Sequence, residues 1–295
     1  MVIPNARSLI SALAACLAGT GWAAAEDWTV DRFHLFYSND SNAAPRLDRW
    51  RTVALSGEWL FEHGHARQVG VQLGAEIIAP ERLSPSGIPI DRAFAGLLQV
   101  KFRDYRKFDW LETRFGAGLS VVGPQTGLSD FLDAAHEILG GAPVSAFTAN
   151  TQVPNEVYLD LGGEVAAQIP LNGATVRPFV EAMAGVETYA RAGIDVSFSG
   201  EVGLQRMPVT GALMGSAPDG WSVTGGFDVT HVMQSGLIPA GRPVTLKQER
   251  TRVRANLTYG FGDRSIDVGL AWLGPEFKEQ SSGQFIGTVG LSFGF

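Results

Sequence analysis

Most of this chain alternates apolar residues with polar or small ones, which is the pattern of β-strands that have one apolar face. Residues 50–61 are the clearest case, since every second position is apolar or glycine: Val53, Leu55, Gly57, Trp59 and Phe61. The polar face of the same segment carries Thr52, Ala54, Ser56 and Glu58. The pattern predicts about twelve strands, at 28–37, 49–61, 67–78, 91–103, 109–122, 156–169, 174–186, 192–203, 221–234, 249–261, 265–273 and 284–295.

Alternation alone fits both a soluble β-sandwich and a membrane β-barrel. The segments run for about 10 to 13 residues, the length of tilted membrane strands. Their polar faces combine Arg, Glu and Gln, which suits a wet lumen better than a dry sandwich core. An even number of strands is typical of bacterial barrels. We therefore predict an all-β fold, an antiparallel transmembrane β-barrel of about twelve strands.

The connections predict which end of this barrel carries the longer loops. With the N-terminus in the periplasm, the outer loops are 38–48, 79–90, 123–155, 187–191, 235–248 and 274–283. The inner turns are mostly short, as is usual in such barrels, although 204–219 is long for a turn. In the third and longest outer loop, helical spacing of apolar residues between Leu128 and Leu139 predicts a short helix. We expect its Leu and Phe stripe to pack into the barrel mouth.

The N-terminal segment, residues 1–25, has the features of a secretory signal peptide. Arg7 provides the positive charge, an apolar run follows, and Ala23–Ala25 forms a small-residue cleavage site. This leaves residues 26–295 for the outer-membrane barrel. A lipoprotein signal is the alternative, because residues 13–16 end on Cys16. Either signal directs the chain out of the cytoplasm.

The chain has 295 residues and a formal net charge of −7. This negative charge argues against nucleic acid as a partner. The single cysteine, Cys16, lies in the predicted signal, so no disulfide framework is expected. No stretch reaches the roughly 18 apolar residues of a membrane helix.

Four polar features fall near the same predicted rim of the barrel. Asn39 and Asp40 start the first outer loop, Thr52 lies on the returning strand, residues 91–94 read Asp-Arg-Ala-Phe, and His136 lies on the predicted helix. Each also has a structural interpretation: Asn-Asp is a common turn pair, and a helix histidine beside Leu132 often has a packing role. Their convergence at one end of the barrel makes them candidates for a site.

The order of these motifs resembles the lipid A 3′-O-deacylase family of Gram-negative outer membranes. The motifs are Ser-Asn-Asp, then Asp-Arg-x-x-Thr, then Glu-x-x-x-Pro followed by Asp-Arg-Ala-Phe-Ala-Gly, and then Gly-Pro with Ala-Ala-His twelve residues later. The resemblance covers about residues 36–170. It implies a twelve-stranded barrel, a bound Ca²⁺ ion and hydrolysis of the 3′-acyloxyacyl group of lipid A in the outer leaflet.

By position, Asn39, Asp40, Thr52 and His136 match residues of the family pattern. The resemblance implies that Asp40 and Asn39 hold Ca²⁺, that Asn39 and Thr52 position the reacting groups, and that His136 is the general base. Asp133, three residues before His136, is expected to orient the imidazole. The chain departs from the pattern where the family helix reads Gln-Asn, since Leu132 and Asp133 stand there. It also lacks a lysine in the second outer loop.

Two alternatives to a lipid A deacylase stay open from the sequence. An outer-membrane phospholipase would differ only in the head group of its substrate. A non-enzymatic barrel, either a pore or a structural protein, is favoured by the two departures from the family pattern. The partners expected in every case are the outer membrane and its lipids, with lipid A or lipopolysaccharide as the substrate of the first hypothesis.

Overall fold

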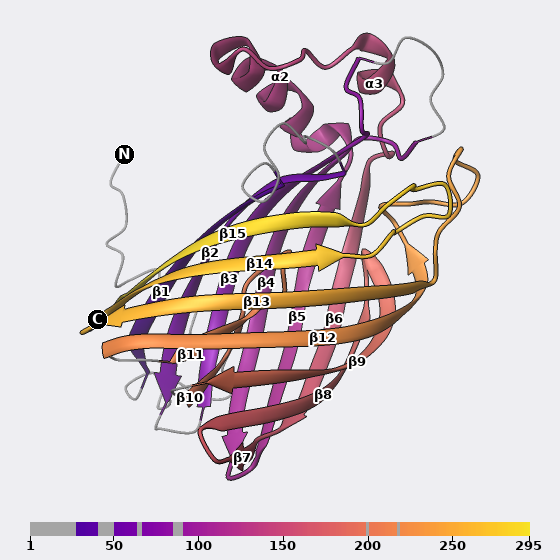
Figure 1. The fold of residues 1–295 in the computed structure, drawn as a ribbon. Helices are drawn as coiled ribbons and strands as arrows, with labels where there is room; N and C mark the ends of the chain where they lie inside the picture. Colours follow the sequence, from indigo (N-terminus) through magenta and orange to yellow (C-terminus); the bar gives the residue numbers. More distant parts are fainter. Residues whose placement is uncertain (1–27, 41–49, 64–66, 85–90, 199–200, 217–218) are drawn as a thin grey trace, which may run out of the picture.

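Twelve antiparallel strands formed by the described residues close into a barrel (Figure 1). This computed structural model describes residues 28–40, 50–63, 67–84, 91–198, 201–216 and 219–295, so the predicted signal peptide lies outside the described residues. The barrel strands are β1 (Thr29–Asn39), β2 (Trp50–His63), β3 (Arg67–Ala79), β4 (Ala95–Phe108), β5 (Leu111–Val122), β6 (Glu156–Ala167), β8 (Ala174–Ala184), β9 (Glu187–Phe198), β12 (Asp219–Ser235), β13 (Glu249–Phe261), β14 (Arg264–Leu273) and β15 (Gln284–Gly294). A short strand, β7 (Ile169–Leu171), pairs with β8 beside β6. This confirms the predicted fold class.

Closure depends on two pairings, one between the first and last strands of the chain and one between β6 and β8. β1 pairs with β15 over eight residue pairs, from Arg32 with Gly294 to Asn39 with Gly287. β6 pairs with β8 from Leu161 with Ala184 to Ala166 with Phe179, which continues the ladder past the short strand β7. Because every barrel strand has a partner on both sides, no barrel strand presents an unpaired edge to lipid.

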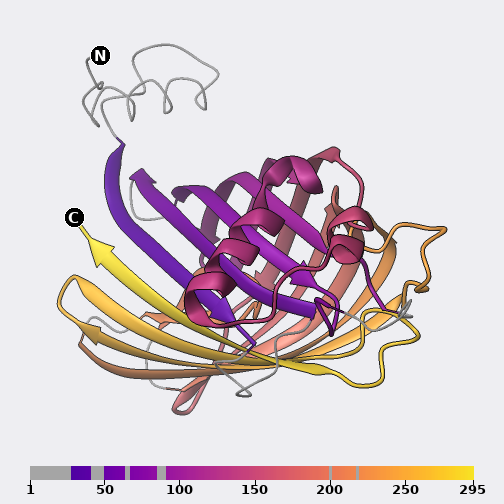
Figure 2. The ribbon, with the colours of Figure 1, turned by 90° about the horizontal axis from the view of Figure 1, so that it is seen from above.

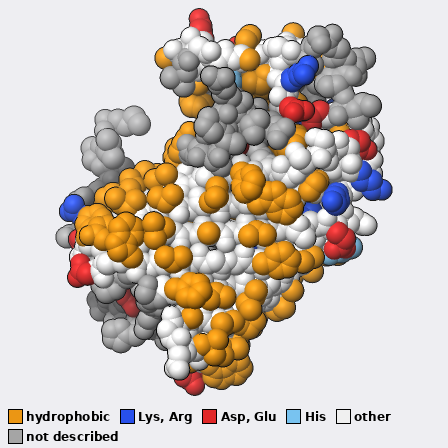
Figure 3. Space-filling model, viewed as in Figure 1, with side chains coloured by type: hydrophobic (Ala, Val, Ile, Leu, Met, Phe, Trp, Pro, Cys, Tyr) orange, Lys and Arg blue, Asp and Glu red, His pale blue; other side chains and the backbone are white. Residues whose placement is uncertain are grey.

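The side chains are arranged inside out relative to a water-soluble protein. Large apolar residues on the outer wall are exposed, among them Leu55, Leu73, Leu119, Val253 and Phe285. On the face seen in Figure 3, hydrophobic side chains gather over the outer wall of the barrel. Residues at alternate positions face the lumen and are polar and buried: examples are Ser56, Gln72, Ser120, Arg254 and Thr288. An apolar belt around a polar interior is the arrangement that a lipid bilayer requires.

The charged residues of the lumen are paired across strands. Arg177 contacts Glu112 at 2.6 Å and Glu164 at 2.7 Å. Arg254 contacts Asp195 at 2.6 Å. Pairing of this kind offsets the cost of taking charges out of bulk water.

A hairpin fills part of the lumen, and the sequence did not predict it. β10 (Glu201–Arg206) pairs with β11 (Leu213–Ser216) between β9 and β12. Arg206 fastens this hairpin to the wall through Glu164 at 2.8 Å and Asp195 at 2.7 Å. On another side, Met207, Ala212 and Met214 form a buried apolar cluster with Phe36. The segment expected to be a long inner turn is therefore a plug, which we call the lumen hairpin.

Two predicted strands are displaced along the chain. The strand expected at 91–103 is β4, Ala95–Phe108, so residues 91–94 precede this strand. The strand expected at 192–203 is β9, Glu187–Phe198. The outer loop expected at 187–191 is absent, since only Gly185 and Val186 connect β8 with β9. This connection requires glycine, because Gly185 has a φ of 151° and a Cβ there would lie 2.0 Å from Oδ1 of Asp160.

The third predicted outer loop does carry the expected helix. Here η2 (Pro124–Thr126) leads into α2 (Leu128–Leu139), and α3 (Ala146–Asn150) follows. None of the helices in the described part of the chain is long and apolar enough to cross a membrane. We call the end of the barrel that carries these helices the helix end.

Helix α2 packs against the outer wall of the barrel. The prediction that its Leu and Phe stripe packs into the barrel mouth was therefore wrong. Leu132 is 5% exposed and lies in one apolar cluster with Ile77, Ala79, Leu83 and Phe94. Ile77 and Ala79 alternate along β3 with lumen-facing positions, so they belong to the outer wall. Seen from above, α2 crosses over the wall formed by the first strands (Figure 2).

The facing of the strands predicts different costs for one charge placed at two adjacent positions. Leu55→Arg puts the charge on the lipid side and should lower the free energy of unfolding by about 2–4 kcal/mol. Ser56→Arg puts the same charge beside the interior cavity and should cost clearly less. Urea unfolding in lipid vesicles measures both. Equal losses for the two variants would contradict the facing of β2.

Candidate functional site

His136 lies in the last turn of α2, and glycines set both ends of that helix. Gly127 and Gly140 flank the helix with φ values of 69° and 77°, the left-handed region that glycine adopts at little cost. The N–H groups of Gly140 and Gly141 donate to the carbonyl oxygen of His136 at 2.8 and 2.9 Å. The helix therefore ends with a capping turn that fixes the backbone at His136.

The imidazole of His136 is oriented by a backbone carbonyl. Its Nδ1 lies 2.6 Å from the oxygen of Ala142. A carbonyl oxygen only accepts hydrogen bonds, so Nδ1 donates and Nε2 is the basic nitrogen of the neutral ring. The ring also packs against Gly141, where a Cβ would lie 2.6 Å from Cγ of His136. The ring is thus held in one tautomer with Nε2 as the base.

Asp133 contacts the loop that follows α2. Its Oδ1 accepts a hydrogen bond from the N–H of Val144 at 2.9 Å. The carboxylate thereby ties the loop after α2 back to the helix, and Ala142 in that loop makes the orienting contact with His136. The sequence could not indicate this, because the contact depends on the chain reversal after Gly140.

Asp40 and Thr52 come together on the lumen side of the rim. Asp40 follows β1, is 1% exposed, and donates its N–H to the carbonyl oxygen of Thr52 at 3.3 Å. Gln284, at the start of β15, donates from Nε2 to Oδ2 of Asp40 at 3.4 Å and to the carbonyl oxygen of Arg51 at 3.3 Å. The buried Thr52 hydroxyl donates to the carbonyl oxygen of Trp50 at 3.5 Å. Three strands thus converge on Asp40.

Asn39 lies on the opposite side of the barrel wall from Asp40. Its Nδ2 donates to the hydroxyl of Tyr37 at 3.0 Å, and Tyr37 is 42% exposed on the lipid side. Alternation along β1 explains the split, because neighbouring residues of a strand point to opposite faces. Extending the pattern of the first predicted strand by two residues would have placed Asn39 on the lipid side.

The described contacts form two groups at the helix end. One joins Asp40 with Thr52 and Gln284, and the other joins His136 and Asp133 with the loop after α2. These hydrogen bonds join residues within each group and do not link the two groups. Both groups lie at the same end of the barrel, as the predicted strand order indicated.

An ion network at the same rim was missed by the sequence. Glu276, between β14 and β15, contacts Nε of Arg51 at 2.7 Å, NH1 of Arg92 at 2.5 Å and NH1 of Arg250 at 3.7 Å. Arg51 also contacts Glu76 at 2.7 Å. No local pattern could reveal this network, because its five members come from five separate parts of the chain. Only Arg92 had been singled out, as part of the motif at residues 91–94.

The charges around Glu276 change its ionisation. Burial by itself raises the pKa of a carboxyl group. The positive charges of Arg51, Arg92 and Arg250 outweigh burial and hold the pKa of Glu276 well below its usual value. The carboxylate is therefore charged at neutral pH, and it fastens the connection before β15 to the rim.

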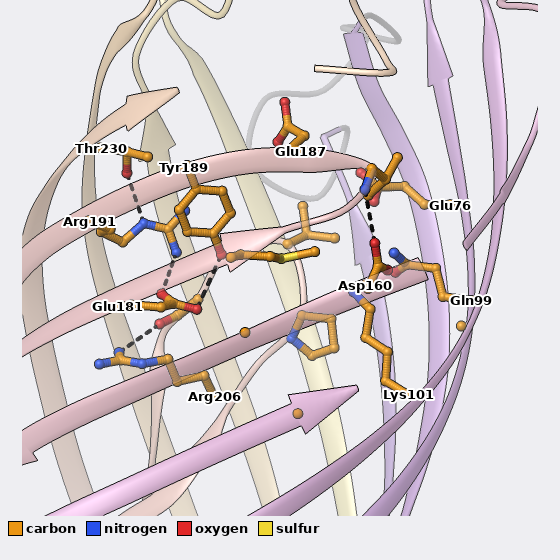
Figure 4. A pocket seen from close by; sticks show the side chains of 18 of the residues that line it. Glu76, Gln99, Lys101, Asp160, Glu181, Glu187, Tyr189, Arg191, Arg206 and Thr230 are labelled. Carbon is orange, nitrogen blue, oxygen red and sulfur yellow. Dashed lines mark hydrogen bonds and ion pairs between the residues drawn. The ribbon is translucent and has the colours of Figure 1, made fainter. Parts of the chain in front are cut away.

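Below the rim lies an interior cavity of about 320 Å³ (Figure 4). Glu76 and Glu187 line it together with Arg206 of the lumen hairpin. In its wall, Arg191 contacts Glu181 at 2.9 Å and the hydroxyl of Thr230 at 2.8 Å. These paired charges make the cavity a polar space.

The oxygen atoms around Asp40 fit the chemistry of calcium, with one carboxylate as the charged donor. They comprise that carboxylate and the backbone carbonyl oxygen of Thr52, whereas Gln284 faces Asp40 with its Nε2 and its Oε1 accepts from the N–H of Arg51 at 3.2 Å. Calcium takes oxygen ligands of these kinds. Within the described ranges, no group of three or more His, Cys, Asp or Glu side chains could hold a metal ion. A calcium ion here would depend on Asp40 and on neutral oxygens.

The lowered pKa of Glu276 predicts a pH dependence of stability. A carboxyl group with a lowered pKa in the folded state stabilises the protein above its unfolded pKa, about 4.3, and loses this effect as pH falls towards the folded value. Glu276→Gln should cost about 3–5 kcal/mol at pH 7, since it leaves buried arginines without their partner. It should also flatten the decline of stability below about pH 4.3.

Denaturant unfolding in detergent at pH 7 and pH 3.5 measures both effects. Glu137→Gln on the exposed side of α2 is the matched control and should behave as the parent protein. A Glu276→Gln variant whose stability declines as steeply with acid as that of the parent would contradict the assigned network.

Comparison with known proteins identifies the family. A family model described as "Outer membrane protein LpxR" matches residues 9–295. The structure of LpxR from Salmonella typhimurium superposes with a TM-score of 0.76 at 20% identity, covering 90% of this chain and 100% of that chain. The β-domain of the Bordetella autotransporter BrkA is more distant, with a TM-score of 0.46 and 12% identity over 92% of this chain and 100% of that chain. No curated protein matches the chain. Because the family model spans nearly all of it, this chain belongs to the LpxR family of outer membrane proteins.

Proposed function

We propose that this chain is a calcium-dependent ester hydrolase that removes the 3′-acyloxyacyl group from lipid A in the outer leaflet. The observation that carries the proposal is the position of His136, whose basic Nε2 is presented by a helix packed on the lipid-facing wall. Membership of the LpxR family supports the same conclusion. A base beside the outer wall suits a substrate that resides in the membrane.

We infer that the helix end faces the cell exterior. Outer-membrane barrels carry short turns on the periplasmic side and longer loops on the outside. At the end opposite the helices, β4 and β5 are joined by Asp109 and Trp110, and β13 and β14 by Gly262 and Asp263. A site at the helix end would then meet lipid A, which occupies the outer leaflet.

In the proposed reaction, Nε2 of His136 takes a proton from a water molecule as its oxygen attacks the ester carbonyl. The resulting imidazolium returns the proton to the leaving alkoxide when the carbon–oxygen bond of the ester breaks. The products are a free fatty acid and a hydroxyl group on the remaining lipid. Ala142 keeps Nδ1 protonated throughout, which maintains Nε2 as the base.

The other predicted site residues would hold a calcium ion or contact the lipid substrate. Calcium, when bound, polarises an ester carbonyl and stabilises negative charge on its oxygen. Asp40 would hold the ion together with the neutral backbone oxygen of Thr52. Asn39, whose amide lies on the lipid side of the wall, would donate a hydrogen bond to the substrate.

A non-enzymatic barrel is the second candidate, and Leu132 favours it. The family pattern has a polar residue at this position, whereas Leu132 is buried in the contact between α2 and the wall. A pore is the weaker form of this candidate, because the lumen hairpin occupies the interior and is fastened by Arg206. A phospholipase would use the same residues on a different head group.

We predict that His136→Ala lowers the hydrolysis of lipid A by about 10²–10⁴-fold, the usual contribution of a general base. Asp133→Ala should cost less, since its carboxylate holds the loop through Val144 and touches the ring only indirectly. His231→Ala is the matched control, because His231 is an exposed histidine on β12 that pairs with Glu249. Fatty acid release from lipid A, measured on folded purified protein, gives the rates.

Near-normal turnover by folded His136→Ala would contradict the hydrolase mechanism. It would favour the non-enzymatic barrel, in which α2 has only a packing role. Release of fatty acid from phospholipid instead of lipid A by the parent protein would assign the phospholipase.

We predict that Asp40→Asn abolishes the response to calcium while the barrel still folds. Calcium should raise the unfolding temperature of the parent protein, because a ligand that binds only the folded state stabilises it. Magnesium should act weakly, since it requires a tighter octahedral shell and dehydrates reluctantly. Thermal unfolding with chelator, calcium or magnesium measures the effect without any substrate. An equal calcium shift in Asp40→Asn would remove Asp40 from the metal site.

A further inference from the structure

Helix α2 has two apolar stripes, and the protein covers one of them. The first contains Leu128 and Leu132, which pack against the wall. The second follows positions i, i+3, i+4 and i+7: Phe131, Ala134, Ala135 and Ile138. Phe131 is 64% exposed and Ile138 is 85% exposed, an unusual state for such large apolar side chains. We call this second stripe the outer stripe of α2.

The outer stripe lies beside the wall contact and away from the charged face of the helix. At about 100° per residue, its centre is roughly a quarter turn from the stripe of Leu128 and Leu132. Asp130 and Glu137 fall approximately opposite the wall, and both are exposed. Helix α2 is therefore divided into a wall face, an apolar flank and an acidic face, which is typical of a helix at a membrane surface.

The lipid belt of the barrel reaches the place where α2 is attached. Val53 of β2 and Ile77 of β3 belong to the contact with α2. Further along the lipid side lie Leu55, two residues from Val53 on β2, and Leu73, four residues from Ile77 on β3, and these are 52% and 46% exposed. The helix thus extends a surface that already faces hydrocarbon.

The contact between α2 and β4 is close enough to fix the position of the helix on this surface. At Gly96 on β4, a Cβ atom would lie 2.3 Å from Oγ1 of Thr126 and 2.9 Å from Cβ of Leu128. Thr126 in turn donates to the carbonyl oxygen of Gly123 at 2.8 Å. The start of α2 is therefore held directly on the wall, and the direction of the outer stripe is fixed with it.

We propose that the outer stripe of α2 is immersed in the hydrocarbon of the outer leaflet. Phe131 and Ile138 contact the acyl chains of the surrounding lipids, and the acidic face meets water and head groups. The occupant is lipid because the stripe continues the lipid belt at the attachment of α2. This inference concerns the position of the helix in the membrane and does not depend on the proposed hydrolysis.

The position of α2 has a consequence for access to the rim. If the outer stripe is immersed, α2 extends the lipid-facing surface of the barrel into the leaflet. His136 then lies on the opposite flank of the helix, across the Leu128–Leu132 contact. A lipid could then move from the leaflet along the barrel wall without leaving the membrane plane. Entry from the side would avoid exposing acyl chains to water, which costs about 0.8 kcal/mol per CH₂ group.

Spin labels test this proposal without any measurement of activity. In a Cys16→Ser background, which lacks cysteine, Ile138→Cys and Phe131→Cys are labelled on the intact barrel in phosphatidylethanolamine–phosphatidylglycerol vesicles. Accessibility to oxygen, which concentrates in hydrocarbon, is compared with accessibility to a nickel chelate, which stays in water. Leu73→Cys provides the lipid-facing reference, and Glu137→Cys on the acidic face provides the aqueous one.

We expect the labels at 131 and 138 to match Leu73→Cys, with an oxygen-to-nickel ratio several-fold above that of Glu137→Cys. Nickel access at 138 equal to that at 137 would overturn the proposal and place the stripe in water. Low access to both reagents would also overturn it, because the stripe would then be covered by protein, such as a second copy of the chain. Heat-modifiable migration of each variant confirms that the barrel is folded.

Discussion

The hydrogen-bond ladder of the closed barrel is the constraint on which the rest of the structure depends. In a membrane, no water is available to satisfy an unpaired backbone group, so every strand needs a partner on both sides. The pairings of β1 with β15 and of β6 with β8 meet this requirement. Closure then fixes which strand ends share a rim, and so it places Asp40 of β1 beside Thr52 of β2 and Gln284 of β15.

The same solvent determines how charge is distributed. Lipid excludes charged side chains from the outer wall, so the arginines and carboxylates of the strands face the lumen. There they must be paired, and most bonds cross from one strand to another or to the lumen hairpin, as Arg206 does with Glu164 and Asp195. The interior is therefore a structural ion network. The chemistry that we propose lies at the rim, where loops leave the barrel and meet the lipid.

Helix α2 connects this rim to the membrane. Its contact with Ile77 and Ala79 holds it on the outer wall, and the turn after Gly140 brings Ala142 to the imidazole of His136. One short helix thereby has three different sides: one packs on the wall, one carries His136, and one exposes Phe131 and Ile138. The side with His136 and the exposed apolar side both adjoin the wall contact. In our proposals, this one contact would therefore position the base and immerse the apolar flank.

The sequence alone determined the barrel class, the facing of the strands, the helix in the longest loop and the gathering of the candidate residues at one end. Those features follow from local periodicity and from strand order. The tertiary structure alone decided the Glu276 network, the lumen hairpin, the placement of α2 outside the mouth and the contact of His136 with Ala142. Each of these features joins segments that barrel closure or a chain reversal brings together. The spacing of apolar residues and the short motifs describe only neighbouring residues, so they do not predict such contacts.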